Sequence, residues 1–167
     1  MSAHYSFNNP SWTTVAVADT TTMTANGACF LQGANATQIQ IVNEVYMGGL
    51  ATSSTPVNMV LARDSTVGVT SITLGTNGKL AALDATTVGA ATPIAGFSAT
   101  TMPQRAATLH LQQLAFNLFG GIVRWVAQST FAISQVGLSA NTGELSLSGF
   151  TAGTNGLLAS NIVFEVL

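Results

Sequence analysis

Charged side chains are scarce in this sequence. Lys and Arg together number 4 and Asp and Glu 6, so charged residues make up 6% of 167 residues, against about 25% in an ordinary soluble domain. With a formal net charge of -2, the chain lacks the cations that neutralise phosphates in nucleic-acid complexes. We therefore expect no nucleic-acid partner, and we expect a surface built from Thr, Ser, Asn and Gln.

Cysteine and histidine are almost absent, with 1 Cys and 2 His. The single thiol, Cys29, cannot form an intrachain disulfide, and its apolar neighbours favour a buried, unreactive side chain. No metal-ligating residue stands at ligand spacing from His4 or His110, and no phosphate-binding loop or nucleophile elbow is present. The sequence predicts no catalytic residue, no metal and no cofactor. One enzymatic alternative stays open, because distant strands could bring two carboxylates together as in glycoside hydrolases.

Long hydrophobic runs are also missing. The most apolar stretch, residues 114–127, contains Asn117 and Arg124 and falls short of the roughly 20 apolar residues that span a bilayer. The first residues form neither the basic nor the apolar region of a signal peptide. We therefore expect no membrane partner and synthesis in a cytoplasm.

Alternation of apolar and polar residues with period two dominates the chain and predicts strands. In 38–47 it predicts one face with Ile39, Ile41, Val45 and Met47 and another with Gln40, Glu44 and Tyr46. In 108–118 the phase changes at Gln113, which predicts a β-bulge. Further strands are expected at 13–18, 28–32, 58–62, 69–74, 122–127, 131–136, 144–149 and 161–167. Asn-Gly and Gly-Gly turns separate them, so the pattern predicts an all-β, antiparallel β-sandwich that forms a single domain over 1–167.

Two segments lack a place in this compact sandwich. Residues 1–11 are polar and aromatic and are interpreted as an N-terminal arm that lies on the body or reaches a neighbour. Residues 75–107 are rich in Gly, Ala and Thr and lack strong periodicity. Because loops of this length usually serve binding, we interpret 75–107 as a long contact loop.

A few charged residues stand inside apolar strands. Alternation places Arg124 on one face with Ile122 and Val126, and Trp125 on the opposite face. A buried or interfacial arginine needs a carboxylate partner, within the chain or in another subunit. The available strand carboxylates are Glu44, Glu144 and Glu165.

Arg63 and Asp64 end a predicted strand. They are interpreted as a solvated rim or, alternatively, as an assembly contact. Because Arg and Trp are enriched among residues that dominate interface energies, the candidate interface residues are Arg124, Trp125, Arg63, Asp64 and Trp12.

Two stretches carry a resemblance to known proteins. They are 44–65, which begins EVYMGG and ends VLARDS, and 119–127, FGGIVRWVA. They resemble small virion proteins of tailed bacteriophages, of the capsid decoration or minor head type. The resemblance implies a jelly roll or related sandwich that forms a small homo-oligomer, with a trimer expected. It also implies binding to the major capsid protein on the outside of the virion.

The resemblance therefore predicts a structural virion protein, and the low charge agrees with repeated subunit contacts. The alternative is a receptor- or carbohydrate-binding β-sandwich module of a phage fibre. Light scattering and co-sedimentation with assembled heads discriminate between the two functions.

Overall fold

The computed structural model describes residues 3–8, 14–15, 28–32, 37–66, 79–83, 94–96, 103–128, 133–136, 144–150 and 157–167. These residues form strands β1 (Ala3–Asn8), β2 (Thr14–Val15), β3 (Ala28–Gln32), β4 (Ile39–Leu50), β5 (Pro56–Thr66), β6 (Lys79–Ala82), β7 (Ile94–Gly96), β8 (Gln104–Asn117), β9 (Ile122–Val126), β10 (Ile133–Val136), β11 (Glu144–Phe150) and β12 (Leu157–Val166). In the part of the chain that is described, no helix has the length and apolar character to span a membrane.

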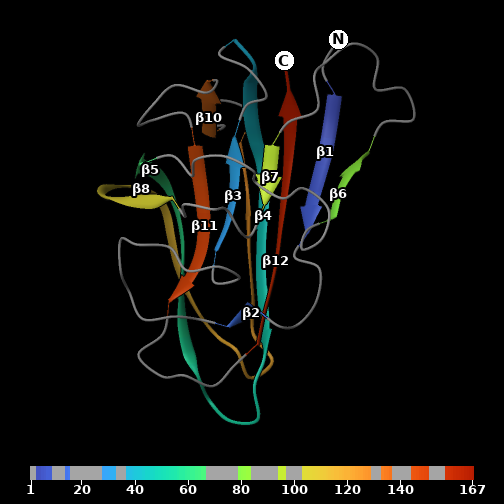
Figure 1. Ribbon diagram of the computed structural model, residues 1–167. Coiled ribbons are helices and arrows are strands. Elements are labelled where there is room, and N and C mark those ends of the chain that lie inside the picture. Colours follow the sequence, from blue (N-terminus) through green and yellow to red (C-terminus); the bar gives the residue numbers. More distant parts are fainter. Residues whose placement is uncertain are drawn as a thin grey trace.

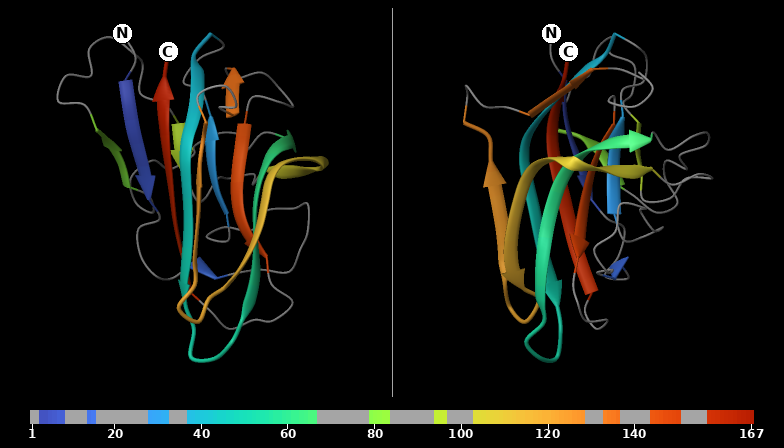
Figure 2. Two further views of the ribbon diagram at one scale, coloured as in Figure 1. Left: turned by 180° about the vertical axis from the view of Figure 1, so that it is seen from behind. Right: turned by 90° about the vertical axis from the view of Figure 1, so that its left-hand side faces the viewer.

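The strands form two antiparallel sheets that pack face to face (Figure 1). The first sheet has the order β10-β4-β12-β1-β6, with β9 also paired to β4 and β2 to β12. The second has the order β7-β3-β11-β5-β8. Long β4, β5, β8 and β12 give the sandwich its main axis, as the two views of Figure 2 show.

Eight of these strands follow the jelly-roll order. In chain order they are β1, β3, β4, β5, β8, β9, β11 and β12. The first pairs with the last, the second with the seventh, the third with the sixth and the fourth with the fifth. Contacts of β4 with β12 and of β5 with β11 then complete one sheet each. This double Greek-key arrangement is a jelly roll, so the predicted antiparallel, jelly-roll-like β-sandwich is confirmed.

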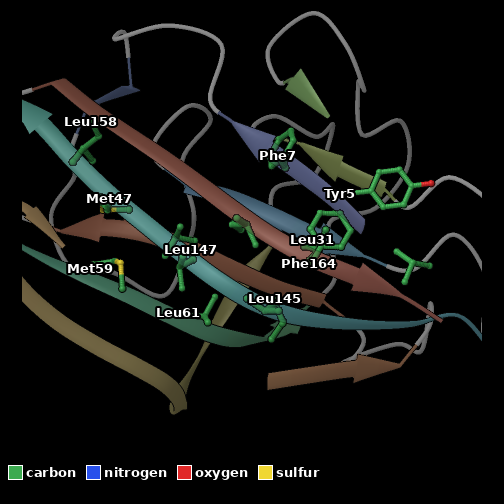
Figure 3. Packing of buried hydrophobic residues seen from close by; sticks show 14 of the residues in the cluster. Tyr5, Phe7, Leu31, Met47, Met59, Leu61, Leu145, Leu147, Leu158 and Phe164 are labelled. Carbon is green, nitrogen blue, oxygen red and sulfur yellow. The ribbon is translucent and has the colours of Figure 1, made fainter. Parts of the chain in front are cut away.

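The hydrophobic core lies between the two sheets. Figure 3 shows side chains from both sheets converging there, and Tyr5 stacks on Phe164 with ring centroids 5.7 Å apart. The sheets approach closely at Gly149, where an added Cβ atom would lie 2.7 Å from Leu158 Cδ1. The largest fully buried side chains are Phe7, Phe164, Leu31, Met47, Met59, Leu61, Leu118, Leu145, Leu147 and Leu158.

The N-terminal residues correct one prediction. Residues 3–8 of the expected arm form β1, which lies between β12 and β6 in the first sheet. Ala3, Tyr5 and Phe7 are buried in the core, and the residues between them are half-buried. The prediction of an N-terminal arm is therefore wrong for residues 3–8. A short alternation within a polar, aromatic segment is enough to form an inner strand.

The faces of β4 correct another prediction. Val45 and Met47 are buried as expected, but Gln40 and Val42 are buried in place of Ile39 and Ile41. The cause is a register shift opposite Val163 and Phe164, which reverses the alternation within β4. Gln40 therefore points into the sandwich, where its Nε2 donates to the backbone oxygen of Gln32 on the other sheet, at 2.7 Å.

Two further predictions concern the middle of the chain. The expected long contact loop, 75–107, contains β6, β7 and the first residues of β8. Leu83 and Pro103 adjoin these strands, and the other residues of the segment lie outside the described ones. The expected bulge in 108–118 is present, because the β5–β8 register shifts between Leu61 and Ala62. The bulge lies at Leu111, two residues before the predicted Gln113. Gln112 is the partner of Leu61 and His110 is the partner of Ala62, so Leu111 has no partner in the β5–β8 register.

Candidate interaction surface

The start of the first stretch that carries the phage resemblance lies beside the second stretch in the first sheet, whereas the end of the first stretch belongs to β5 in the second sheet. Residues 44–48 of β4 pair with 122–126 of β9 in antiparallel register. The side view in Figure 2 shows β9, in orange, at the margin of the molecule. The turn before β9 requires glycine, because Gly120 has φ +79° and a Cβ atom on Gly121 would lie 2.2 Å from the backbone oxygen of Asn117.

Large apolar side chains are exposed along this margin. Ile122 is 71% exposed, Phe119 61%, Leu50 60% and Val126 50%. Leu50 ends β4, Phe119 lies in the turn, and Ile122 and Val126 belong to β9. We call these four residues, together with Glu44, Tyr46 and Arg124, the β4–β9 face.

The charges of the β4–β9 face neutralise each other. Arg124 Nε donates to Glu44 Oε1, and the Arg124 guanidinium stands 5.2 Å from the centre of the Tyr46 ring. The hydrogen bond from Arg124 lowers the pKa of Glu44, and a hydrogen bond with Glu44 raises the pKa of Tyr46. Of the two alternatives for the partner of Arg124, the structure shows one within the chain, and of the three strand glutamates it is Glu44.

The other candidate interface residue of β9 points away from this face. Trp125 and Val123 are half-buried and pack against the core, whereas Arg124 and its neighbours at alternate positions are exposed. The predicted alternation of β9 is confirmed. Trp125 therefore packs between β9 and the core and does not contribute its ring to the exposed face.

The remaining candidates lie elsewhere. Strand β5 continues to Thr66, Asp64 is fully buried, and Arg63 is half-buried. The prediction that Asp64 lies on a solvated rim is therefore wrong. Its side chain is also not part of an exposed contact surface of the chain. Trp12 lies outside the described residues.

Asp64 belongs to a cluster on the second sheet that the sequence did not predict. Leu145 pairs with Arg63. Because the two strands are antiparallel, Glu144, which precedes Leu145, lies beside Asp64, which follows Arg63. Both carboxyl groups are fully buried, and burial raises the pKa of Asp64 to about 7. The alternation of Glu144, Ser146 and Ser148 with leucines was the available signal, but it predicts an exposed polar face.

This pair bears on the alternative of a glycoside hydrolase, which requires distant strands to bring two carboxylates together. They do meet, but a glycoside hydrolase needs two carboxyl groups about 5 Å or more apart, on either side of an accessible substrate. Asp64 and Glu144 lie side by side on adjacent strands and have no exposed surface. The cluster is therefore built to hold strands together and leaves no room for a sugar ring.

Another titratable side chain on the second sheet, His110, contacts Arg105 of its own strand. The distance between His110 Nε2 and Arg105 Nη1 is 2.7 Å. Within the described ranges, no three His, Cys, Asp or Glu residues form a group that could hold a metal ion. The β4–β9 face therefore has the features of a contact surface, apolar and without net charge.

Comparison with known proteins adds no family. No protein-family model and no curated protein matches the chain. One solved structure that it resembles weakly is described as "Crystal structure of the T13 IBDV viral particle reveals a missing link in icosahedral viruses evolution". The chain is 11% identical to that chain, and the match covers 99% of this chain and 39% of that one, with a TM-score of 0.18. At this similarity the match carries no argument about fold or function.

Proposed function

We propose that the chain is a structural virion protein that self-associates and binds the outside of a phage capsid, as a decoration or minor head protein. Its partners are other copies of itself, with a trimer expected, and the major capsid protein. It is made in the host cytoplasm, and no catalytic role is proposed. One observation carries the proposal: the start of one stretch that resembles phage virion proteins, residues 44–48, pairs with the other stretch at the β4–β9 face, where four large apolar side chains are exposed.

The chemistry of the β4–β9 face favours burial in a contact. Exposed apolar clusters on soluble proteins commonly mark interaction sites. The only charged side chains of this face, Arg124 and Glu44, form an ion pair, so covering them removes no net charge from water. The scarcity of charge in the whole chain lowers the desolvation cost of further contacts in the same way.

The edge of the sheet offers a second means of association. Among the described strands, β9 hydrogen-bonds only to β4. Soluble proteins usually protect such edges with lysine, proline or a bulge, whereas β9 is Ile-Val-Arg-Trp-Val. A strand of another chain can therefore add to β9.

The size of a stable contact sets a further requirement. A stable interface buries about 800 Å² on each partner, which exceeds what one five-residue strand offers. We therefore expect the contact to extend from β9 onto the outer residues of β4. Binding of a homo-oligomer to a repeating lattice would multiply individually weak contacts.

Multi-angle light scattering over a range of concentrations, combined with co-sedimentation with phage heads, tests the proposal. We expect a defined oligomer that pellets with heads. Ile122→Lys places a charge in the β4–β9 face and should lower both the oligomer mass and the pelleted fraction. The matched control is Leu83→Lys, since Leu83 is 56% exposed and follows β6 at the opposite edge of the same sheet.

The proposal is wrong if the unmodified chain is a monomer at every concentration and stays in the supernatant with heads. Equal losses in the two lysine variants would contradict the assignment of the β4–β9 face. Circular dichroism of each variant shows that the strands are retained.

The alternative function, a receptor- or carbohydrate-binding module, has one observation in its favour. A row of polar side chains crosses the first sheet at successive paired positions Asn8, Asn161, Tyr46 and Arg124. Asn161 Nδ2 donates to Asn8 Oδ1 at 2.6 Å and to Ser6 Oγ at 2.7 Å. Amide, phenol and guanidinium groups in a row suit the hydroxyl groups of a glycan.

The guanidinium of Arg124 covers one face of the Tyr46 ring, which limits stacking of a sugar there. A glycan screen of the purified chain tests this alternative. Binding that is lost in Asn161→Ala and kept in Ile122→Lys would favour it over capsid binding.

A further inference from the structure

The strongest feature outside the β4–β9 face is the carboxyl cluster of the second sheet, which we define as Asp64, Glu144, Arg105 and Ser146. It joins three adjacent strands, because Asp64 is on β5, Arg105 on β8, and the other two on β11. Asp64 pairs with Arg105 in the β5–β8 register. All four side chains are buried.

The arrangement of the cluster favours one bound proton. Ser146 Oγ donates to Asp64 Oδ1 at 2.5 Å, and Glu144 lies beside Asp64 on the neighbouring strand, because Leu145 pairs with Arg63. An ionised carboxylate can only accept hydrogen bonds. Two carboxyl groups that are fully buried at neighbouring positions repel each other when both are ionised, so the pair favours a state with one proton.

The balance of charge gives the same result. With one proton on the pair, the cluster carries one negative charge opposite the positive charge of Arg105. Loss of that proton would leave two buried carboxylates beside one guanidinium, which low-dielectric surroundings disfavour strongly. Burial is accordingly the main cause that raises the pKa of Asp64, from its ordinary value of 3.8 to about 7, and Arg105 opposes it.

Arg105 has a further set of partners on the same side of the sheet. Its Nη1 lies 2.7 Å from His110 Nε2, and its guanidinium stands 4.6 Å from the centre of the Phe150 ring. Because arginine only donates, Nε2 is the acceptor in this contact. The described titratable groups that face Asp64 are thus Glu144 from β11 and Arg105 and His110 from β8.

We propose that the carboxyl cluster is a pH-sensitive lock on the junction of β5, β8 and β11, closed by one shared proton and weakened when both carboxyl groups are ionised. The lock lies on the sheet opposite to the β4–β9 face and is independent of the proposed function. It makes the stability of the sandwich depend on pH in a direction that is unusual for a carboxyl group.

The sign follows from proton linkage. The native chain holds a proton on the cluster that the unfolded chain has already released, so unfolding becomes easier as the pH rises from the ordinary pKa of Asp64 towards its raised pKa. A difference of one bound proton corresponds to a roughly tenfold change in the unfolding equilibrium constant per pH unit. Above the raised pKa, the native chain has also lost the proton and the dependence ends.

Asp64→Asn provides the test, because its amide is isosteric, can accept from Ser146 and donate to Glu144, and does not titrate. Urea unfolding is measured at pH 5, 6, 7, 8 and 9. The unfolding equilibrium constant of the unmodified chain, divided by that of Asp64→Asn, should rise roughly tenfold per unit between about pH 5 and 7 and then become constant. The matched control is Glu44→Gln, for which the same ratio should be constant, because the pKa of Glu44 is lowered.

A ratio for Asp64→Asn that is constant or falls between pH 5 and 7 would overturn the proposal. Carbon NMR of the Asp64 carboxyl in the unmodified chain gives a second test that does not depend on the variant folding. The expected midpoint lies near 7, and a midpoint near the ordinary value of aspartate would also overturn the proposal. The chain has only 6 acidic residues, which simplifies the assignment.

Discussion

Asn117 holds together the two connections at the end of the sandwich that carries Leu50 and Phe119. Its Oδ1 accepts from the backbone nitrogens of Thr55, at 3.0 Å, and Phe119, at 2.9 Å. Its Nδ2 donates to Ser54 Oγ at 2.7 Å. Figure 1 shows both connections, between β4 and β5 and between β8 and β9, at the lower end of the molecule. One side chain thus positions the exposed apolar residues at the tip of the β4–β9 face.

Asn117→Ala removes the acceptor of two backbone N–H groups. Each such hydrogen bond contributes about 0.5 to 1.5 kcal/mol, so we expect the free energy of unfolding to fall by about 1 to 3 kcal/mol. Urea unfolding followed by tryptophan fluorescence measures it, since Trp125 lies on the adjacent β9. The urea dependence should keep its slope, because the surface exposed on unfolding is unchanged.

Asn117→Asp is the matched control for this prediction. A carboxylate keeps the acceptor for Thr55 and Phe119, and the Ser54 hydroxyl can rotate to donate to it. We expect a loss below about 1 kcal/mol, the value of a typical single hydrogen bond. An alanine variant as stable as the unmodified chain, or an aspartate variant as unstable as the alanine variant, would refute the assigned role of Asn117.

Two further predictions concern the packing of the two sheets. Gly149→Ala places a Cβ atom 2.7 Å from Leu158 Cδ1 and 3.1 Å from Met47 Sδ, so we expect a loss of about 1 to 3 kcal/mol from overpacking. In a Leu158→Ala background this loss should shrink, and purely additive losses in a double-mutant cycle would contradict the close contact. Gln40→Met removes the donor to the backbone oxygen of Gln32 and should cost about 1 to 3 kcal/mol in urea unfolding. A neutral outcome would show that this hydrogen bond between sheets has no net value.

Local sequence pattern predicted the strands well, because period two is a property of each strand by itself. The segment 28–32 is a strand with the predicted bounds, and β9 alternates as predicted around Arg124. The apolar character of the β4–β9 face was visible in the same way, since Ile122 and Val126 share a face with Arg124. The sequence pattern leaves three glutamates as possible partners of Arg124, because the choice among them depends on which strands are neighbours in the sheet.

The predictions that were wrong depended on contacts between distant strands. A register shift against β12 reversed the faces at the start of β4, so that Gln40 is buried. The expected arm contains β1 because β12 and β6 lie on both sides of it. Nothing in either segment alone specifies these neighbours.

The sequence by itself determined an all-β chain of low charge whose alternating segments must bury one face. The tertiary structure alone decided which face is buried on each strand and which polar groups are buried with it. Glu144 and Asp64 stand 80 residues apart in the sequence, and only the antiparallel register of β11 with β5 brings them together. The physical reason is that a strand specifies its own alternation, whereas hydrogen bonding between strands specifies register, and register determines which side chains become neighbours.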